Sequence, residues 1–463
     1  MQRFLAKYGL AAHLALLAVA PLFLFPFCSA HDGARTVLWL ALLAALWFLA
    51  SPSTRRGEPL HVARSRVWRA TLRDPLFWLS LALVLFSGLR ALNGGVRMAY
   101  DAEKSVWSLA TAAVAEFPGC VEGAGFLPFA ATVALAVVVV AVRQALGRSA
   151  RIVFLLLASA LAGLAASVAL VAAFEGHAAC AGLFACPNAS ASYFGCACGV
   201  GFLAGTAALV ACFEQKWHAA LVAIPFSVGG TAAGAFAFAP PAMSGLFAAA
   251  ALPVLAFAFF YARKVLHGTG DYRMLVVYAV ALTMGGLAVA FLTPEAALAA
   301  RLDAFANRAF VPEGFLDVRR VLSDIALRTW KTAPWIGTGV GSFALDVRFQ
   351  ALASEWPFVP RGLVALANGG WLLLVERGLA GTALVALPFG FLVFTYARRL
   401  ALWAVERRLP HPAALLAPLV VLVLALSVPF DASFLRADVL LAAAAVLAVS
   451  AKAFPHSELT SNG

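Results

Sequence analysis

Charged side chains are scarce in this chain, and their scarcity excludes an ordinary soluble fold. Asp, Glu, Lys and Arg make up 12% of its 463 residues, and 63% are hydrophobic, whereas soluble domains carry about 25% charged residues. The short strands of alternating apolar and polar residues that build a membrane β-barrel are missing too. We therefore predict an all-α, polytopic membrane protein, because backbone groups in lipid must hydrogen-bond within their own segment.

Twelve apolar blocks are close to the length that crosses about 30 Å of hydrocarbon as a helix. They cover roughly residues 9–28, 36–51, 75–92, 126–142, 152–174, 197–213, 219–239, 245–261, 274–293, 379–397, 413–429 and 437–453. Ionisable residues are almost absent from them, and the two halves show no repeat, whereas transporters usually have both features. The chain divides into nine spans over 1–293, an outer segment over 294–378 and three spans over 379–463.

Acidic residues are outnumbered, so the formal net charge is +12. The basic excess lies in every second connection, as the positive-inside rule requires. The largest clusters are Arg55, Arg56, Arg64, Arg66, Arg69 and Arg73; Arg143, Arg148 and Arg151; Arg263, Lys264 and Arg273; and Arg398, Arg399, Arg407 and Arg408. This pattern predicts that both termini are cytoplasmic, and it assigns the charge to membrane lipids rather than to nucleic acid.

Cysteine patterns of zinc sites are absent, although the chain has seven cysteines. The run "CAGLFACPNASASYFGCAC" contains no histidine, and its spacings fit no zinc template. Cys28, Cys120, Cys180, Cys186, Cys196 and Cys198 fall on the predicted outer side, and Cys212 near the inner side. Disulfides are the simplest interpretation in an oxidising compartment, with free buried thiols or a metal site as alternatives.

Known phosphate-binding loops are also absent. The stretch "PWIGTGVGSF" places Gly337, Gly339 and Gly341 in alternation. It is not G-x-G-x-x-G, and no Gly-Lys-Ser/Thr follows, as a Walker A loop requires. The stretch is either a tight bend between helices or a turn whose exposed N–H groups hold phosphate.

Two outer connections are long. Residues 93–125 carry a stripe of Val106, Leu109, Ala113, Val114 and Phe117, which predicts an interfacial helix or a lid packed on neighbouring helices. Residues 293–361 carry eight basic and seven acidic residues, which indicates a folded subdomain. It begins with a helix in "TPEAALAARL".

A second helix is predicted in "LDVRRVLSDIALRTW". Its apolar stripe consists of Val318, Val321, Leu322, Ile325 and Thr329. Arg320, Asp324 and Arg328 recur on another face, where i,i+4 ion pairs are expected. The apolar stretch 363–397 is too long for one crossing, and we expect it to break at a helix cap on Gly378.

The stretches "RRVLSDIALRTWKTAPWIGTGVGSF" and "ANGGWLLLVERGLAG" resemble the C-terminal motifs of the O-antigen ligase and O-antigen polymerase family of bacterial membrane glycosyltransferases. The family pattern is an arginine-headed helix, a Pro-x-x-Gly-x-Gly-x-Gly-x-Phe turn, then His-Asn-x-x-Leu and Glu-x-Gly-Leu-x-Gly. The matching positions are Arg319, Asn368, Glu376, Gly378 and Gly381. The resemblance covers about residues 316–450, and the helix layout is also similar to that of O-antigen ligases.

The resemblance implies transfer of a glycan from an undecaprenyl-diphosphate-linked donor to an acceptor on the outer face of the bacterial inner membrane, without cofactor or metal. The acceptor would be a lipid A core, another glycan chain or a protein. The implied catalytic residues are Arg319, Asn368 and Glu376. The implied substrate-binding residues are Arg320, Arg348, Arg361, Gly337, Gly339 and Gly341. Arginine suits a diphosphate leaving group, because its planar donors stay protonated.

Histidine is absent from residues 294–378, and Ala367 occupies the position of the family's motif histidine. Because that histidine is the family's proposed base, one expectation is that a carboxylate takes the proton of the acceptor hydroxyl instead. The candidate carboxylates are Glu376, Glu355 and Asp346. The alternatives are a differently activated acceptor, a non-catalytic relative that binds the lipid carrier or a partner, and a transporter. These motifs do not separate ligase from polymerase.

The charge pattern makes a prediction about orientation. A reporter enzyme that is active only outside the cytoplasm should be active when fused near Ser354 and inactive when fused near Leu60 or Leu400. Reporter activity in cells measures this directly. The reverse pattern would overturn the predicted topology.

Overall fold

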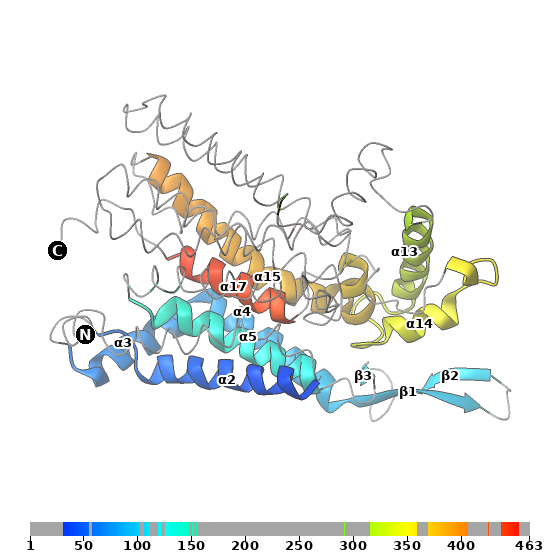
Figure 1. The fold of residues 1–463 in the computed structure, drawn as a ribbon, viewed down its shortest axis with the longest axis horizontal. Helices are drawn as coiled ribbons and strands as arrows, with labels where there is room; N and C mark the ends of the chain where they lie inside the picture. Colours follow the sequence, from blue (N-terminus) through cyan, green and yellow to red (C-terminus); the bar gives the residue numbers. More distant parts are fainter. Residues whose placement is uncertain are drawn as a thin grey trace.

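The computed structural model describes residues 31–54, 58–101, 106–110, 119–121, 126–147, 315–358, 369–405 and 437–452, and single residues at 151, 154, 291 and 425 (Figure 1). Its elements are α2 (His31–Ala50), α3 (Leu60–Leu72), α4 (Pro75–Leu92), β1 (Gly94–Asp101), β2 (Val106–Ala110), β3 (Cys120–Val121), α5 (Phe126–Gln144), α13 (Phe315–Thr332), α14 (Phe343–Gln350), η2 (Trp356–Phe358), α15 (Gly369–Val405) and α17 (Ala437–Ser450).

The predicted helical class is confirmed for most of the described chain. The apolar blocks 36–51, 75–92, 126–142, 379–397 and 437–453 coincide with α2, α4, α5, α15 and α17. Two helical segments, Pro75–Leu92 and Gly369–Leu402, are long and apolar enough to cross a membrane. The other predicted blocks lie outside the described residues, except for the single positions 154, 291 and 425.

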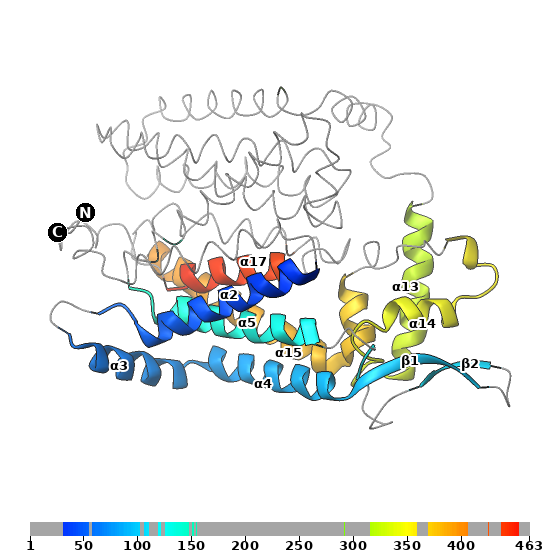
Figure 2. The ribbon, with the colours of Figure 1, turned by 60° about the horizontal axis from the view of Figure 1, so that its bottom comes forward.

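Helix α5 lies at the centre of these helices. It packs against α2, α4 and α17, and α15 packs against α4 and α17 (Figure 2). The buried residues of α5 and α17 are mostly alanine and valine, and small side chains let membrane helices approach closely. Large apolar side chains are exposed instead, among them Trp39, Leu43, Trp47, Leu85, Leu89 and Phe394. This arrangement suits helices whose outer faces contact lipid.

Helix α4 begins at a well-formed cap. The Oδ1 atom of Asp74 accepts a hydrogen bond of 3.2 Å from the backbone N–H of Leu76, and Pro75 occupies the first helical position. An N-cap aspartate satisfies a backbone donor that has no partner within the helix. Proline at the first helical position costs no hydrogen bond, because the N–H group at that position has no partner within the helix. The cap therefore separates α4 from the preceding α3.

The interfacial helix predicted within 93–125 is wrong where the structure describes this connection. β1 and β2 form an antiparallel hairpin in which Arg97 pairs with Ala110 and Asp101 with Val106. β3 lies parallel to the other edge of β1. The stretch "GGVRMAYD" alternates large apolar with other residues, a period of two that is typical of a strand. The described part of the chain is therefore mainly helical with one small sheet, and it is not purely α-helical as predicted.

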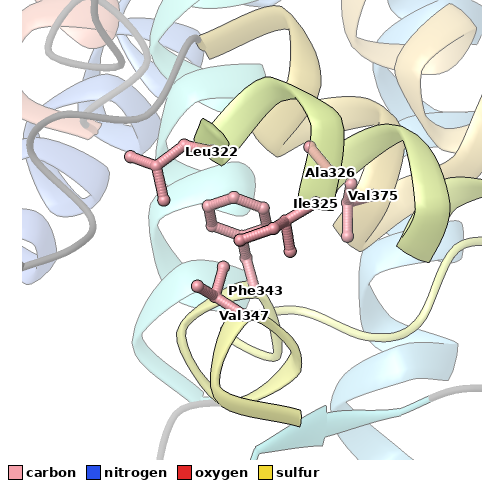
Figure 3. Close-up of a cluster of buried hydrophobic side chains, with 6 residues drawn as sticks. All are labelled: Leu322, Ile325, Ala326, Phe343, Val347 and Val375. Carbon is pink, nitrogen blue, oxygen red and sulfur yellow. The ribbon is translucent and has the colours of Figure 1, made fainter. Parts of the chain in front are cut away.

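Helices α13 and α14 lie with the hairpin at one end of the helix layer, and α3 lies at the opposite end (Figures 1 and 2). The predicted apolar stripe of α13 is confirmed, because Leu322 and Ile325 are buried in a cluster with residues of α14 and α15 (Figure 3). The full cluster consists of Leu322, Ile325, Ala326, Phe343, Val347 and Val375. The helix predicted in "TPEAALAARL" lies outside the described residues.

The polar face of α13 differs from the prediction. Arg328 pairs with Glu355 at 2.6 Å, and in the described part of the chain no ion pair joins Asp324 to Arg320 or Arg328. Glu355 also accepts a hydrogen bond from the backbone N–H of Leu352 at 2.9 Å. Arg328 therefore ties α13 to the segment that follows α14, rather than stabilising its own helix.

The cluster in Figure 3 makes a prediction about stability. Phe343→Ala should cost roughly 3–5 kcal/mol, because truncating a buried phenylalanine leaves a cavity among its neighbours. Leu352→Ala is the matched control, since the Leu352 side chain is 56% exposed. Thermal unfolding of the detergent-purified protein checks both variants. Equal melting temperatures for the two would contradict the role assigned to the cluster.

Candidate functional site

The glycine-rich stretch forms a bend whose backbone only glycine adopts readily. Gly337, Gly339 and Gly341 have φ angles of 78°, 125° and 80°, in the region that L side chains rarely occupy. A β-carbon on Gly337 would lie 2.5 Å from the backbone nitrogen of Gly378. The bend therefore contacts α15 backbone to backbone, with no room for a side chain between them.

The partner of this bend is a kink in α15. Gly378 has φ 64° and ψ −173°, which breaks the helix there and confirms the predicted break at this residue. The break frees backbone groups on both sides. The N–H groups of Thr338 and Gly339 donate to the carbonyls of Val375 and Glu376 at 2.8 and 3.1 Å.

Two further hydrogen bonds run in the opposite direction. The N–H groups of Leu379 and Ala380 donate to the carbonyls of Pro334 and Trp335 at 2.9 and 3.0 Å. Helix ends leave such groups without partners inside the helix, so the bend completes the hydrogen bonding of the kink. We call this pairing of 334–343 with 375–381 the turn–kink dock.

The Glu376 side chain lies on the same dock. Its carboxylate interacts with the backbone N–H groups of Gly341 and Phe343, where α14 begins. Backbone N–H groups at a helix N-terminus favour an anion, and here that anion is the protein's own carboxylate. The donors of the bend described above are thus engaged within the chain, which favours the bend over the phosphate-loop interpretation.

Arg90, in the last turn of α4, is a buried charge that the motif analysis did not select. Its side chain is 1% exposed, and its Nη1 donates to the Glu376 carbonyl at 2.5 Å. Its Nη2 donates to the carbonyl of Ile336, and its guanidinium lies 4.7 Å from the centre of the Phe86 ring. A lone arginine in an apolar span is a functional signal, and that signal was present in the sequence.

Arg377 is the second cation that the motif analysis missed. It interacts electrostatically with Arg90, Glu376 and Cys120. It also lines a cavity of about 350 Å³ between α4, α5, α15 and α17. Among the described residues that line this cavity Arg377 is the one charged group, and most of the others are apolar. The described lining residues are Leu76, Ser80, Leu83, Thr132, Leu135, Ala136, Val139, Leu373, Arg377, Val385, Ala386, Pro388, Phe389, Leu392, Ala425, Leu440 and Ala444.

The predicted site residues are only partly brought together. The three glycines and Glu376 meet in the turn–kink dock. Arg319 and Arg320 lie in α13, where the Arg320 side chain is exposed, and Arg348 lies in α14. Asn368, Arg361 and Ala367 lie outside the described residues.

The three candidate carboxylates have different surroundings. Asp346 is buried, and its Oδ2 accepts hydrogen bonds from Thr338 and Ser342 at 2.7 and 2.9 Å; burial raises its pKa. The hydrogen bond from Arg328 lowers the pKa of Glu355, which makes it a weak base. Glu355 is therefore the least suited to take a proton.

Cys120 is a free, buried thiol, and burial raises its pKa. It is not part of a disulfide, and the other cysteines lie outside the described residues. Within the described ranges no group of three or more His, Cys, Asp or Glu side chains could hold a metal ion. The chain matches no protein-family model and no curated protein.

The turn–kink dock makes a prediction. Gly337→Ala should destabilise the protein by at least about 1–3 kcal/mol, because the added β-carbon meets backbone at 2.5 Å in a left-handed conformation. Gly390→Ala is the matched control in the same helix as the kink, since nothing lies within 4 Å of its added carbon. Melting temperatures in detergent test the pair. An unchanged melting temperature for Gly337→Ala would show that the dock does not form.

Proposed function

We propose that the chain transfers a glycan from an undecaprenyl-diphosphate-linked donor to an acceptor hydroxyl at the outer face of a bacterial inner membrane. One observation carries the proposal. Two motifs about forty residues apart in sequence meet in the turn–kink dock, which holds Glu376, and the neighbouring Arg377 lines an apolar cavity between the helices. The residues that resemble the family motifs are thus the ones that hold the dock together.

The cavity supports a lipid-linked donor. Its apolar lining suits part of a polyprenyl chain, and Arg377 places a fixed positive charge where a diphosphate would follow that chain. Arg90 supports this arrangement from α4, because its donors hold the carbonyls of Ile336 and Glu376. The proposal keeps the exposed Arg320 as a candidate contact for the diphosphate, and it keeps Arg319, Arg348 and Arg361 as candidates from the sequence motifs alone.

The reaction follows from the donor's chemistry. The acceptor oxygen bonds to the anomeric carbon of the glycan, and the bond from that carbon to the diphosphate oxygen breaks. The electron pair of the broken bond goes to the diphosphate, whose charge the arginines stabilise. A base takes the acceptor proton. We assign this step to Glu376, whose carboxylate lies on the turn–kink dock, and we keep Asn368 as a second candidate catalytic residue.

A second candidate function is favoured by Ala367, which replaces the family's motif histidine. In that case the chain binds the lipid carrier without transferring its glycan. The same cavity and the same Arg377 would serve, but Glu376 would only hold the bend. The two functions differ in whether the carrier is turned over.

The proposal predicts the behaviour of Arg377. Arg377→Ala should lower glycan transfer by about 100-fold, the usual cost of one donor to a developing charge. Arg377→Lys should recover little activity, because an ammonium lacks the planar pair of donors. The assay is transfer by purified protein in liposomes that contain an undecaprenyl-diphosphate-linked glycan.

Lys331→Ala is the control, since this exposed lysine of α13 lies outside the proposed site. Normal transfer by Arg377→Ala would contradict the assignment. Glu376→Gln separates the two functions, because a lost base costs roughly 10²–10⁴-fold in rate. Carrier turnover that is undetectable in the wild type, with donor lipid still bound, would establish the binding function instead. The glycan profile of a deletion strain then separates ligase from polymerase.

A further inference from the structure

A second charged cluster lies at the other end of the helix layer, where α3 meets the ends of α4, α5 and α17. Asp74 caps α4, and its Oδ2 accepts a 2.7 Å hydrogen bond from Nε of Arg143. The same oxygen accepts from the side-chain amide of Gln144. The carbonyl oxygen of that amide accepts from Nζ of Lys452, just beyond α17. We call these four residues the α3-end cluster. Helix α3 lies at the end of the helix layer opposite α13 and α14 (Figure 2).

The α3-end cluster contains two cations and one carboxylate. The Asp74 oxygens are already used, because Oδ1 accepts from Leu76 and Oδ2 from Arg143 and Gln144. Arg143 is 6% exposed, and its Nη1 has no hydrogen-bond partner in the part of the chain that the structure describes. A buried guanidinium donor without an acceptor is costly, so the cluster lacks an anion rather than a cation.

Lys452 lies at the accessible side of the cluster. Its carbonyl accepts a hydrogen bond of 2.6 Å from Arg151. The Arg143 guanidinium lies 5.7 Å from the centre of the Phe391 ring. Lys452 is half-buried, and among the described residues Gln144 accepts from one of its three donors. The cluster can therefore be reached on the side of Lys452.

The adjacent helix α3 indicates the source of the anion. Its buried face consists of Ala63, Val67 and Thr71. Its other residues expose both large apolar groups and arginines; these are Leu60, Val62, Arg64, Trp68, Arg69 and Leu72. A helix with exposed tryptophan, leucine and arginine belongs at the level of lipid headgroups. A soluble anion would not need that surface.

We propose that the α3-end cluster binds the phosphate of an anionic phospholipid, with Arg143 and Lys452 as its donors and α3 against the neighbouring headgroups. Basic pockets between membrane helices bind phospholipid headgroups in this way. The site is independent of the proposed glycan transfer. In the topology predicted from the charge pattern it faces the cytoplasm, whereas the turn–kink dock faces outward.

Thermal unfolding of the full-length, detergent-purified protein tests this site, because a ligand that binds only the native state raises the melting temperature. Phosphatidylglycerol should stabilise the wild type, and phosphatidylcholine with the same acyl chains should have little effect. Lys452→Gln should weaken the apparent affinity for phosphatidylglycerol by roughly 10- to 100-fold, the range for one charge-assisted hydrogen bond. Lys331→Gln, an identical change on the exposed surface of α13, should respond like the wild type.

Arg143→Lys is a second variant. The lysine ammonium can keep the contact with Asp74 but cannot also replace the Nη1 donor of Arg143. Phosphatidylglycerol should therefore stabilise this variant less than it stabilises the wild type. A full wild-type response in Lys452→Gln would overturn the proposal, whether or not Arg143→Lys folds. Equal stabilisation by phosphatidylcholine would do the same. Stabilisation by millimolar inorganic phosphate alone would identify a soluble anion instead of a lipid.

Discussion

The packing of α13 and α14 on the helix layer depends on the contact between two backbones, where the bend at Gly337 meets the kink at Gly378. Four hydrogen bonds cross it, two in each direction. They satisfy donors and acceptors that a broken helix would otherwise leave without partners. Through this contact the cluster formed by α13, α14 and Val375 is joined to a helix long enough to cross a membrane. Helices α13 and α14 are therefore fixed to the helix layer by main-chain geometry rather than by charged surface pairs.

The buried arginine of α4 and the kink of α15 support each other. A guanidinium within an apolar span is costly unless its donors find acceptors. The kink and the bend supply two carbonyls, those of Glu376 and Ile336, that point to Arg90. Arg90 in turn links the bend to the kink, because it donates to one carbonyl of each. Each feature would be unfavourable alone, and together they place a second cation, Arg377, beside a cavity in the layer.

Features that arise from local patterns could be predicted from the sequence. The period of α13, the positive φ angles of the glycines and the break at Gly378 follow from spacing and from glycine's conformational freedom. The hairpin was predicted as a helix, although its residues alternate with a period of two. The partner of Arg328 could not be predicted, because Glu355 comes from a segment whose path depends on α14. The role of Arg90 could not be predicted either, because its two carbonyl acceptors lie 286 and 246 residues away in the sequence.

Those separations have a consequence for how the protein is made. A chain synthesised from its N-terminus contains α4 long before residues 336 and 376 exist. Arg90 therefore lacks its final acceptors until residue 376 has been synthesised. The backbone β-bridge between Cys120 and Val340 also needs a residue that is synthesised late. Contacts between residues this far apart in sequence form slowly. The turn–kink dock therefore forms late in synthesis, and a chain that ends before residue 376 cannot form it.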